Sequence, residues 1–215
     1  MELSPELLLK AYAIGIFPMA ESRSDTEVHW IDPDLRGVLP LETFHAPRGL
    51  RRKVRKKIFE VRCNSAFHQV VKACATPTPG RSDTWINPTI ERLYGGLHEM
   101  GFAHSIECWE DDRLVGGLYG VTLGAAFFGE SMFSVVSDAS KVALVHLVAR
   151  LRKSGFLLLD TQFETPHLRR FGVVEIPRDR YREQLSQAVR TQAQFPSELT
   201  DSELAAFLQS ITQTS

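Results

Sequence analysis

The order of amphipathic and apolar segments predicts an α+β fold, in which helices pack against a mixed sheet. Two observations support this prediction. Residues 104–109 and 114–121 show the period-two pattern typical of antiparallel strands, and helical patterns lie on both sides of them. A continuous apolar run over 156–160 follows the strongest helical pattern, which indicates a central strand buried on both faces.

Length and composition narrow the class of protein. The chain has 215 residues, of which 43% are hydrophobic, which suits one large domain or one domain with a small appendage. No run approaches the roughly 18–20 apolar residues of a membrane span, and the acidic N-terminus does not resemble a signal peptide. Cys63, Cys74 and Cys108 form no CxxC pair, which argues against a disulfide scaffold, a zinc site and a catalytic thiol. We therefore expect a cytoplasmic protein with no metal and no membrane contact.

The N-terminal half predicts three helices separated by loops. A Ser-Pro pair before an apolar pattern and a glycine after it predict a helix over 5–14. The segment 16–36 has two prolines and little periodicity, so we expect a loop. Asn64 is expected to cap a second helix, and Pro88 opens a third one after the proline-rich loop 76–83.

The middle of the chain predicts a hairpin, a strand and a long helix. Strands over 104–109 and 114–121 flank an acidic turn and predict a β-hairpin, and a third strand is expected over 125–129. Asp138 or Ser137 should cap the strongest helix of the chain, whose last turn is basic.

The C-terminal part continues with shorter elements. After the strand at 156–160, a Thr-Pro pair at 165–166 predicts a short helix, and 173–176 reads as another strand. Thr200 and Glu203 have the spacing of a capping box, which predicts a final helix.

A dense run of cations interrupts a chain whose net charge is only −1. Clustered like charge repels itself unless it is solvated or bound to an anion, so the run indicates either a nucleic-acid patch or a solvated basic helix or loop. Its seven members are Arg48, Arg51, Arg52, Lys53, Arg55, Lys56 and Lys57.

Asp160 and Gln162 follow the predicted central strand. They are two residues apart, and period two would place both side chains on one face of the strand. One interpretation is a strand-end turn capped by the carboxylate. The other is a carboxylate–amide pair that orients an amine or hydroxyl, in which the amide oxygen holds an N–H in line.

Glu130 directly follows two phenylalanines in a predicted strand. A carboxylate in that setting is costly without a cationic partner. It therefore predicts either a salt bridge to a core arginine or recognition of a substrate ammonium. Nearby apolar residues could line an adjacent pocket or simply form the core; they are Leu118, Phe127, Met132, Leu144 and Leu159.

Other motifs are absent or weak. The sequence contains no GxSxG, no P-loop and no dinucleotide-binding fingerprint, and none of its seven histidines has a convincing metal spacing. Trp30 and Trp85 lie in polar loops, where an indole can cover the core or provide a stacking platform for a base.

Six blocks of sequence follow one another along the chain: YAIGIFP at 12–18, HWIDPDLR at 29–36, WI at 85–86, GESMFS at 129–134, DASK at 138–141 and DTQ at 160–162. Together, and in this order, they resemble the bacterial leucyl/phenylalanyl-tRNA–protein transferases. The resemblance runs from about residue 5 to about residue 185. It implies transfer of Leu, Phe or Met from aminoacyl-tRNA to the N-terminal amine of proteins that begin with Arg or Lys, which marks them for N-degron degradation.

The resemblance also implies a fold and a set of site residues. The expected architecture is a small N-terminal domain (1–38) and an acetyltransferase-like (GNAT) domain (39–215) that uses no cofactor. Asp160 and Gln162 match the pair credited with amide-bond formation, and Glu130 matches the contact to the substrate amine. The other expected substrate residues are the pocket residues Leu118, Phe127, Leu144, Leu147 and Leu159, the adenosine-stacking Trp85, Ser131, and Met19 at the position of the second half of the adenine sandwich. The basic run at 48–57 matches the surface expected to meet the tRNA acceptor arm.

Some residues depart from the family pattern. Met19 stands where relatives often have tryptophan, and the segment after Gln162 is one of two family versions. Two other functions remain open: a coenzyme-A-dependent N-acyltransferase, disfavoured because 134–141 contains no glycine, and a non-catalytic RNA-binding module, which would leave Glu130 and Asp160 unexplained. The proton acceptor also remains open, with the donor's ribose hydroxyl as one possibility.

Overall fold

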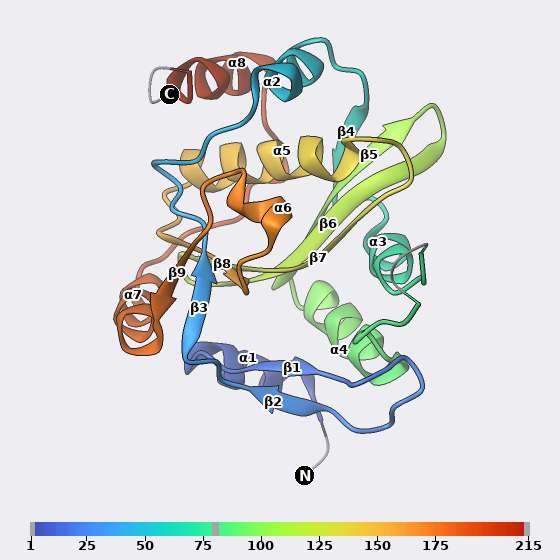
Figure 1. Ribbon diagram of the computed structural model, residues 1–215, viewed down its shortest axis with the longest axis vertical. Helices are drawn as coiled ribbons and strands as arrows, with labels where there is room; N and C mark the ends of the chain where they lie inside the picture. Colours follow the sequence, from blue (N-terminus) through green and yellow to red (C-terminus); the bar gives the residue numbers. More distant parts are fainter. Residues whose placement is uncertain (1–2, 79–81, 213–215) are drawn as a thin grey trace.

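The computed structural model describes residues 3–78 and 82–212 and has the predicted α+β architecture (Figure 1). The described strands are β1 Phe17–Met19, β2 His29–Ile31, β3 Leu35–Val38, β4 Glu60–Cys63, β5 Ala103–Glu110, β6 Arg113–Leu123, β7 Ala126–Ser134, β8 Leu158–Gln162 and β9 Val174–Pro177. Seven of them form one sheet in the order β4-β5-β6-β7-β8-β3-β9, while β1 and β2 form a separate small sheet. The large sheet is mixed, because β7 and β8 pair in parallel and its other described neighbours are antiparallel.

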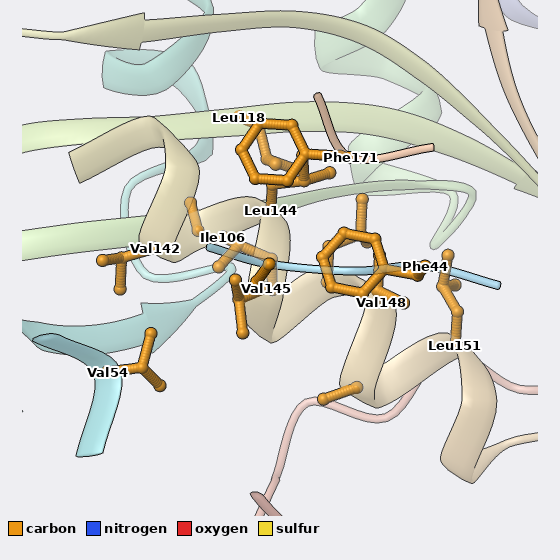
Figure 2. Close-up of a cluster of buried hydrophobic side chains, with 14 of the residues drawn as sticks. Phe44, Val54, Ile106, Leu118, Val142, Leu144, Val145, Val148, Leu151 and Phe171 are labelled. Atoms are coloured by element: carbon orange, nitrogen blue, oxygen red, sulfur yellow. The ribbon is translucent and has the colours of Figure 1, made fainter. Parts of the chain in front are cut away.

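Helices cover both faces of the large sheet. The described helices are α1 Pro5–Ala13, α2 Arg48–Arg55, α3 Phe67–Cys74, α4 Pro88–Glu99, α5 Ala139–Lys153, α6 Pro166–Arg169, α7 Arg178–Arg190 and α8 Asp201–Ser210. The long helix α5 packs on one face together with α2 and α8, and Figure 2 shows part of this core, with α5 side chains among Val54, Ile106 and Leu118. The opposite face is covered by α1, α3, α4 and α7.

Several predicted elements are confirmed. The first helix begins after Ser4, whose hydroxyl accepts a hydrogen bond from the Leu7 amide at 3.3 Å. The hairpin is β5–β6, and the capping box of Thr200 and Glu203 opens α8. The apolar run becomes β8, which lies inside the sheet between β7 and β3. None of the described helices combines the length and the apolar character that crossing a membrane would require.

Other expectations are wrong, for local reasons. The segment 16–36 is not all loop, because it contains β1, β2 and the start of β3, strands too short to show a period. Asn64 does not cap α3. It has a positive φ of 57°, and its side-chain amide bonds the ring of His104 at 3.0 Å, so α3 begins only at Phe67. The loop 76–83 lies partly outside the described residues.

Two further boundaries differ from the prediction. Asp138 precedes α5 but makes no capping bond, because its carboxylate is held by Lys53 and Lys141, each at 2.6 Å. The third strand does not stop at Gly129 but continues as β7 to Ser134, past an irregularity in its pairing with β6. This extension brings Glu130 into the sheet. The division of the chain into domains at residue 38 stays a prediction.

Candidate active site

The large sheet splits between β7 and β8. The two strands pair in parallel only from Ala126↔Leu158 to Phe128↔Asp160. Beyond this point β7 continues beside β6, while β8 ends at Gln162. A cavity of about 300 Å³ lies at the split, and residues 129–132 of β7 and 161–162 of β8 form part of its wall. The split therefore exposes strand residues to a ligand that an unbroken sheet would pair and bury.

A β-bulge places Glu130 at this cavity. In the pairing of β6 with β7, Gly120 lies opposite Gly129 and Tyr119 lies opposite Ser131, so Glu130 has no partner. Gly120 permits the close approach, since a Cβ there would lie 2.3 Å from the carbonyl oxygen of Phe128. A bulge adds one residue and shifts the alternation of side chains that follow it. Glu130 thus faces α1 and α4 while also lining the cavity.

Within the described part of the chain, two tyrosines and no arginine hold the Glu130 carboxylate. The hydroxyls of Tyr12 and Tyr94 each donate to one carboxylate oxygen at 2.6 Å, and the two hydroxyls lie 2.7 Å apart. Burial raises the pKa of Glu130 to about 7; the tyrosine hydrogen bonds lower it, Asp160 raises it and Arg36 lowers it. The salt bridge considered from the sequence is therefore not formed. A cationic ligand in the cavity would supply the missing charge partner.

Gln162 ends β8 in an unusual backbone conformation. Its φ is +56°, in the left-handed region that costs a non-glycine residue roughly 1–2 kcal/mol, and the Phe163 amide donates across it to the Thr161 carbonyl at 2.6 Å. Because of this turn, Gln162 lines the cavity, whereas Asp160 does not. The expectation that both side chains share one face of a regular strand does not hold here.

Asp160 acts from behind the cavity wall. It is fully buried, and its carboxylate accepts four hydrogen bonds. Their donors are Arg36 Nε (3.0 Å), Arg36 Nη2 (2.7 Å), the Tyr181 hydroxyl (2.6 Å) and the backbone N–H of Gln162 (2.8 Å). The last bond caps the turn at Gln162, which is the turn-capping interpretation of the sequence. Asp160 therefore fixes the backbone that positions the side-chain amide of Gln162.

Arg36 is the counter-charge of Asp160. It is 1% exposed, and its guanidinium lies 4.5 Å from the ring centres of both Phe17 and Tyr181. Its remaining Nη1 donates to the Gly15 carbonyl at 2.9 Å. One buried ion pair thus connects the N-terminal segment, β3 and α7 to the end of β8.

Gly37 allows the backbone that follows Gln162 to cross close to β3. Gly37 pairs with Gln162 across β3 and β8. A Cβ at Gly37 would lie 2.5 Å from the Phe163 carbonyl carbon and 2.8 Å from the Glu164 nitrogen. Only glycine fits beneath this crossing, so the turn depends on β3 as well as on β8.

The remaining walls are mostly apolar. Of the residues predicted for substrate binding, the structure brings together in the lining Met19, Trp85, Leu118, Glu130, Ser131, Leu144, Leu147, Leu159 and Gln162. Phe127 is not among them. It is fully buried on the α5 side, with its ring stacked 5.5 Å from that of Phe195.

Three residues that line this cavity each carry a buried polar atom without a hydrogen-bond partner. Five such side-chain atoms occur in the described part of the chain, and Gln162 Nε2, Tyr119 OH and His167 Nε2 are three of them. Buried polar groups are nearly always paired, so unpaired ones that line a cavity indicate a site for polar ligand atoms. Burial lowers the pKa of His167, with smaller contributions from Lys141 and Arg170.

Part of this site cannot be predicted from the sequence. Tyr12 and Arg36 lie inside the family-like blocks, but no local pattern assigns either of them a role. Tyr94 reads as one more inward residue of a helix, and neither Tyr119 nor Tyr181 carries a local signal. Each joins this site only through contacts with residues far away in the chain. In the described residues, no group of three or more His, Cys, Asp or Glu side chains could hold a metal ion.

The basic run forms α2 and the turn after it. Leu50 and Val54 of α2 are buried, so the helix is packed and not merely solvated. Lys53 pairs with Asp138 and Lys57 pairs with Asp201, each at 2.6 Å. Four other members are exposed and form no ion pair within the described residues: Arg48, Arg52, Arg55 and Lys56.

The cavity combines apolar walls with a carboxylate that has no cationic partner among the described residues, an arrangement suited to a ligand with an apolar part and a cationic part. Comparison with known proteins identifies the family. Residues 38–186 match the family model described as "Leucyl/phenylalanyl-tRNA protein transferase", and residues 1–34 match the model of its N-terminal domain. The chain belongs to this family.

Three relatives carry the name leucyl/phenylalanyl-tRNA–protein transferase. The protein of Nitrobacter winogradskyi is 61% identical over 90% of this chain and 86% of its own length. The protein of Maricaulis maris is 57% identical over 98% of this chain and 97% of its own length. The protein of Phenylobacterium zucineum is 62% identical over 87% of this chain and 85% of its own length. A solved structure of a functionally unknown conserved protein from Staphylococcus epidermidis matches with a TM-score of 0.43 at 10% identity, over 82% of this chain and 66% of that chain, which is too distant to assign a fold family.

Proposed function

We propose that this chain transfers Leu, Phe or Met from aminoacyl-tRNA to the N-terminal amine of proteins that begin with Arg or Lys. The observation that carries the proposal is the cavity at the split sheet, where apolar walls, the Glu130 carboxylate and the Gln162 amide meet. Family membership supports the same reaction. The product would enter N-degron degradation, and the reaction would take place in the cytoplasm, where aminoacyl-tRNA is found.

The reaction needs alignment more than activation. The aminoacyl ester is already reactive, and placing an amine against its carbonyl can supply on the order of 7–11 kcal/mol in favourable cases. The amine nitrogen forms the new bond to the carbonyl carbon, the ester C–O bond breaks, and the ribose oxygen leaves with the amine proton. Gln162 lines the cavity, and its buried Nε2 has no hydrogen-bond partner, so this donor is suited to the carbonyl oxygen as negative charge develops there.

The other residues divide between recognition and support. Glu130 would recognise the cationic acceptor, whose charge favours the ionised carboxylate. Leu118, Leu144 and Leu147 would surround the donor side chain, and Trp85 would stack on the terminal adenosine. Asp160 serves as a positioning residue, because it reaches the cavity only through the Gln162 backbone.

The architecture suggests a GNAT-like catalytic domain. The parallel β7–β8 pair that separates at the substrate cavity supports this proposal. The two family models meet between residues 34 and 38, which supports the proposed boundary between a small N-terminal domain (1–38) and the catalytic domain (39–215).

A coenzyme-A-dependent reaction fits this site less well. The N-terminus of α5, where a pyrophosphate loop would lie, contains no glycine and presents the Asp138 carboxylate. A pyrophosphate loop needs glycines so that its backbone can approach the phosphates closely, and this segment offers none.

One assay tests the function. The protein is incubated with labelled leucyl-tRNA and a peptide that begins with Arg, and an N-acetylated copy of the peptide serves as the acceptor control. We expect label on the free peptide alone, and Gln162→Ala should lower turnover at least tenfold. Arg113→Ala, in the exposed hairpin turn, is the matched control and should keep full activity. Acylation only from acetyl-CoA, or tRNA binding without transfer, would refute the proposal.

A further inference from the structure

A second cavity, of about 380 Å³, lies away from the candidate active site, among α2, α5 and α8. Its wall includes Arg150 of α5, which is only 4% exposed. Lys53 and Lys57 also line it. A buried guanidinium at a cavity wall is costly unless an anion accompanies it.

The described neighbours of Arg150 do not provide that anion. Its Nη1 lies 3.3 Å from the His146 carbonyl oxygen and 3.4 Å from His146 Nδ1, and its Nη2 lies 3.4 Å from the Ser197 carbonyl oxygen. These are long contacts to uncharged atoms, since 2.9–3.0 Å is usual. Its Nε is one of the buried polar atoms without a partner.

The titratable groups near Arg150 are also neutral. Burial, with a contribution from Arg150, lowers the pKa of His146 to about 3. Burial raises the pKa of the Cys63 thiol, which contacts the guanidinium, to about 11. At neutral pH both groups are therefore uncharged, while arginine keeps its proton.

The acids in the cavity wall already have cationic partners. Glu60 bonds Arg62 at 2.7 Å, and Asp201 bonds Lys57 at 2.6 Å. Lys53 pairs outside the wall with Asp138. In the described wall, Arg150 is thus the cation without an acidic partner.

We propose that this cavity binds an oxyanion of the phosphate type, with Arg150 at its base and Lys53 and Lys57 beside it. The guanidinium offers a fork of donors that matches such a group. Lys53 and Lys57 are paired with Asp138 and Asp201, and they would add charge by exchanging these partners for the bound oxyanion. The site could take a free phosphate ion or a backbone phosphate of RNA. The second source rests on the proposed function, because Lys53 and Lys57 belong to the basic run proposed to meet tRNA.

Thermal unfolding in inorganic phosphate tests the site itself. Phosphate should raise Tm saturably, by roughly 2–4 °C more than KCl of equal ionic strength. Arg150→Met should abolish this increment, whereas Arg152→Met, on the same helix but outside the cavity wall, should retain it. If Arg150→Met does not fold, Lys57→Gln at the exposed edge should at least halve the increment. The proposal is overturned if wild type shows no phosphate-specific increment, or if the increment survives these changes.

Competition with tRNA then separates the two sources. A backbone phosphate predicts that inorganic phosphate displaces tRNA at constant ionic strength and that Arg150→Met weakens tRNA binding about three- to tenfold. A free phosphate ion predicts a Tm increment with no effect on tRNA affinity. Either result supports the oxyanion site, and neither depends on peptide transfer, so the proposed function can fail separately.

Discussion

At the scale of single residues, the two acids of the site differ in what surrounds them. Asp160 has a full set of donors, including the Arg36 guanidinium, and no contact with the cavity. Glu130 has two neutral hydroxyls and lies at the cavity. One carboxylate is therefore part of the scaffold, while the other has no cationic partner among the described residues.

The raised pKa of Glu130 predicts a pH-dependent stability. With a pKa of about 7 in the folded protein and about 4.5 when unfolded, the folded state holds the proton between these values. Stability from this group is therefore present below about pH 4.5 and is lost as pH rises through about 7. The free energy of unfolding of wild type, relative to Glu130→Gln, should fall by roughly 1–3 kcal/mol from pH 5 to pH 8 in urea titrations.

The matched control for this experiment is Glu110→Gln, in the half-exposed hairpin turn. It should follow wild type across the same range. If the difference in the free energy of unfolding between wild type and Glu130→Gln does not change with pH, the raised pKa of Glu130 is contradicted.

Donor selection is a second residue-scale prediction. The family resemblance assigns both Phe127 and Leu147 to the side-chain pocket, but in the structure only Leu147 lines the cavity. Leu147→Ala should therefore change the Leu-to-Phe donor ratio about fivefold or more, since such pocket changes are worth roughly 1–3 kcal/mol. Phe127→Ala should mainly lower stability, by about 3–5 kcal/mol. Competition between the two charged tRNAs measures the ratio, and a larger shift for Phe127→Ala would show that the donor side chain binds elsewhere.

At the scale of elements, the sequence predicts regular strands and helices better than it predicts bulges and turns within them. Periodicity located the hairpin and β8, and the capping box located α8. The sequence pattern could not reveal the bulge at Glu130 or the left-handed turn at Gln162. Both depend on close approach to glycines of neighbouring strands, Gly120 and Gly37, which no local pattern encodes.

The dependence of the turn on Gly37 can be tested. Gly37→Ala would force its Cβ against the backbone of Phe163 and Glu164, and so move Gln162. Turnover should fall at least tenfold with little change in tRNA affinity. Gly49→Ala, where a Cβ meets nothing within 4 Å, is the control and should leave transfer from an aminoacyl-adenosine donor unchanged. Normal turnover by Gly37→Ala would show that the turn geometry is not required.

The basic helix α2 gives the second element-scale prediction. Its free cations should contact tRNA phosphates, each adding about −0.7 to −0.9 to the slope of log affinity against log salt. Replacing Arg52, Arg55 and Lys56 with alanine should therefore flatten that slope by about 2 and weaken all tRNAs alike. Lys53→Ala alone removes a cation already paired with Asp138, so its effect on the slope should be smaller per residue. An unaltered slope in the triple variant would mean that this face meets only solvent.

At the scale of the whole molecule, the site is assembled from segments far apart in the chain. Hydrogen bonds join Tyr12 of α1 and Tyr94 of α4 to Glu130 of β7. A buried ion pair joins Arg36 of β3 to Asp160 of β8. The sequence could identify Glu130 and Asp160 because a polar residue beside apolar strands is conspicuous. It could not give the tyrosines or Arg36 their roles, because those roles depend on how the sheet orders its strands.

The central claim is that the cavity at the split sheet is the reaction centre. A crystal structure with a non-hydrolysable, amide-linked phenylalanyl-adenosine tests it most directly. We predict the phenyl ring among Leu118, Leu144 and Leu147, the adenine against Trp85, and Gln162 Nε2 within about 3.2 Å of the carbonyl oxygen. Electron density for the phenylalanyl group outside this cavity, or a Gln162 amide turned away from the carbonyl, would contradict the claim.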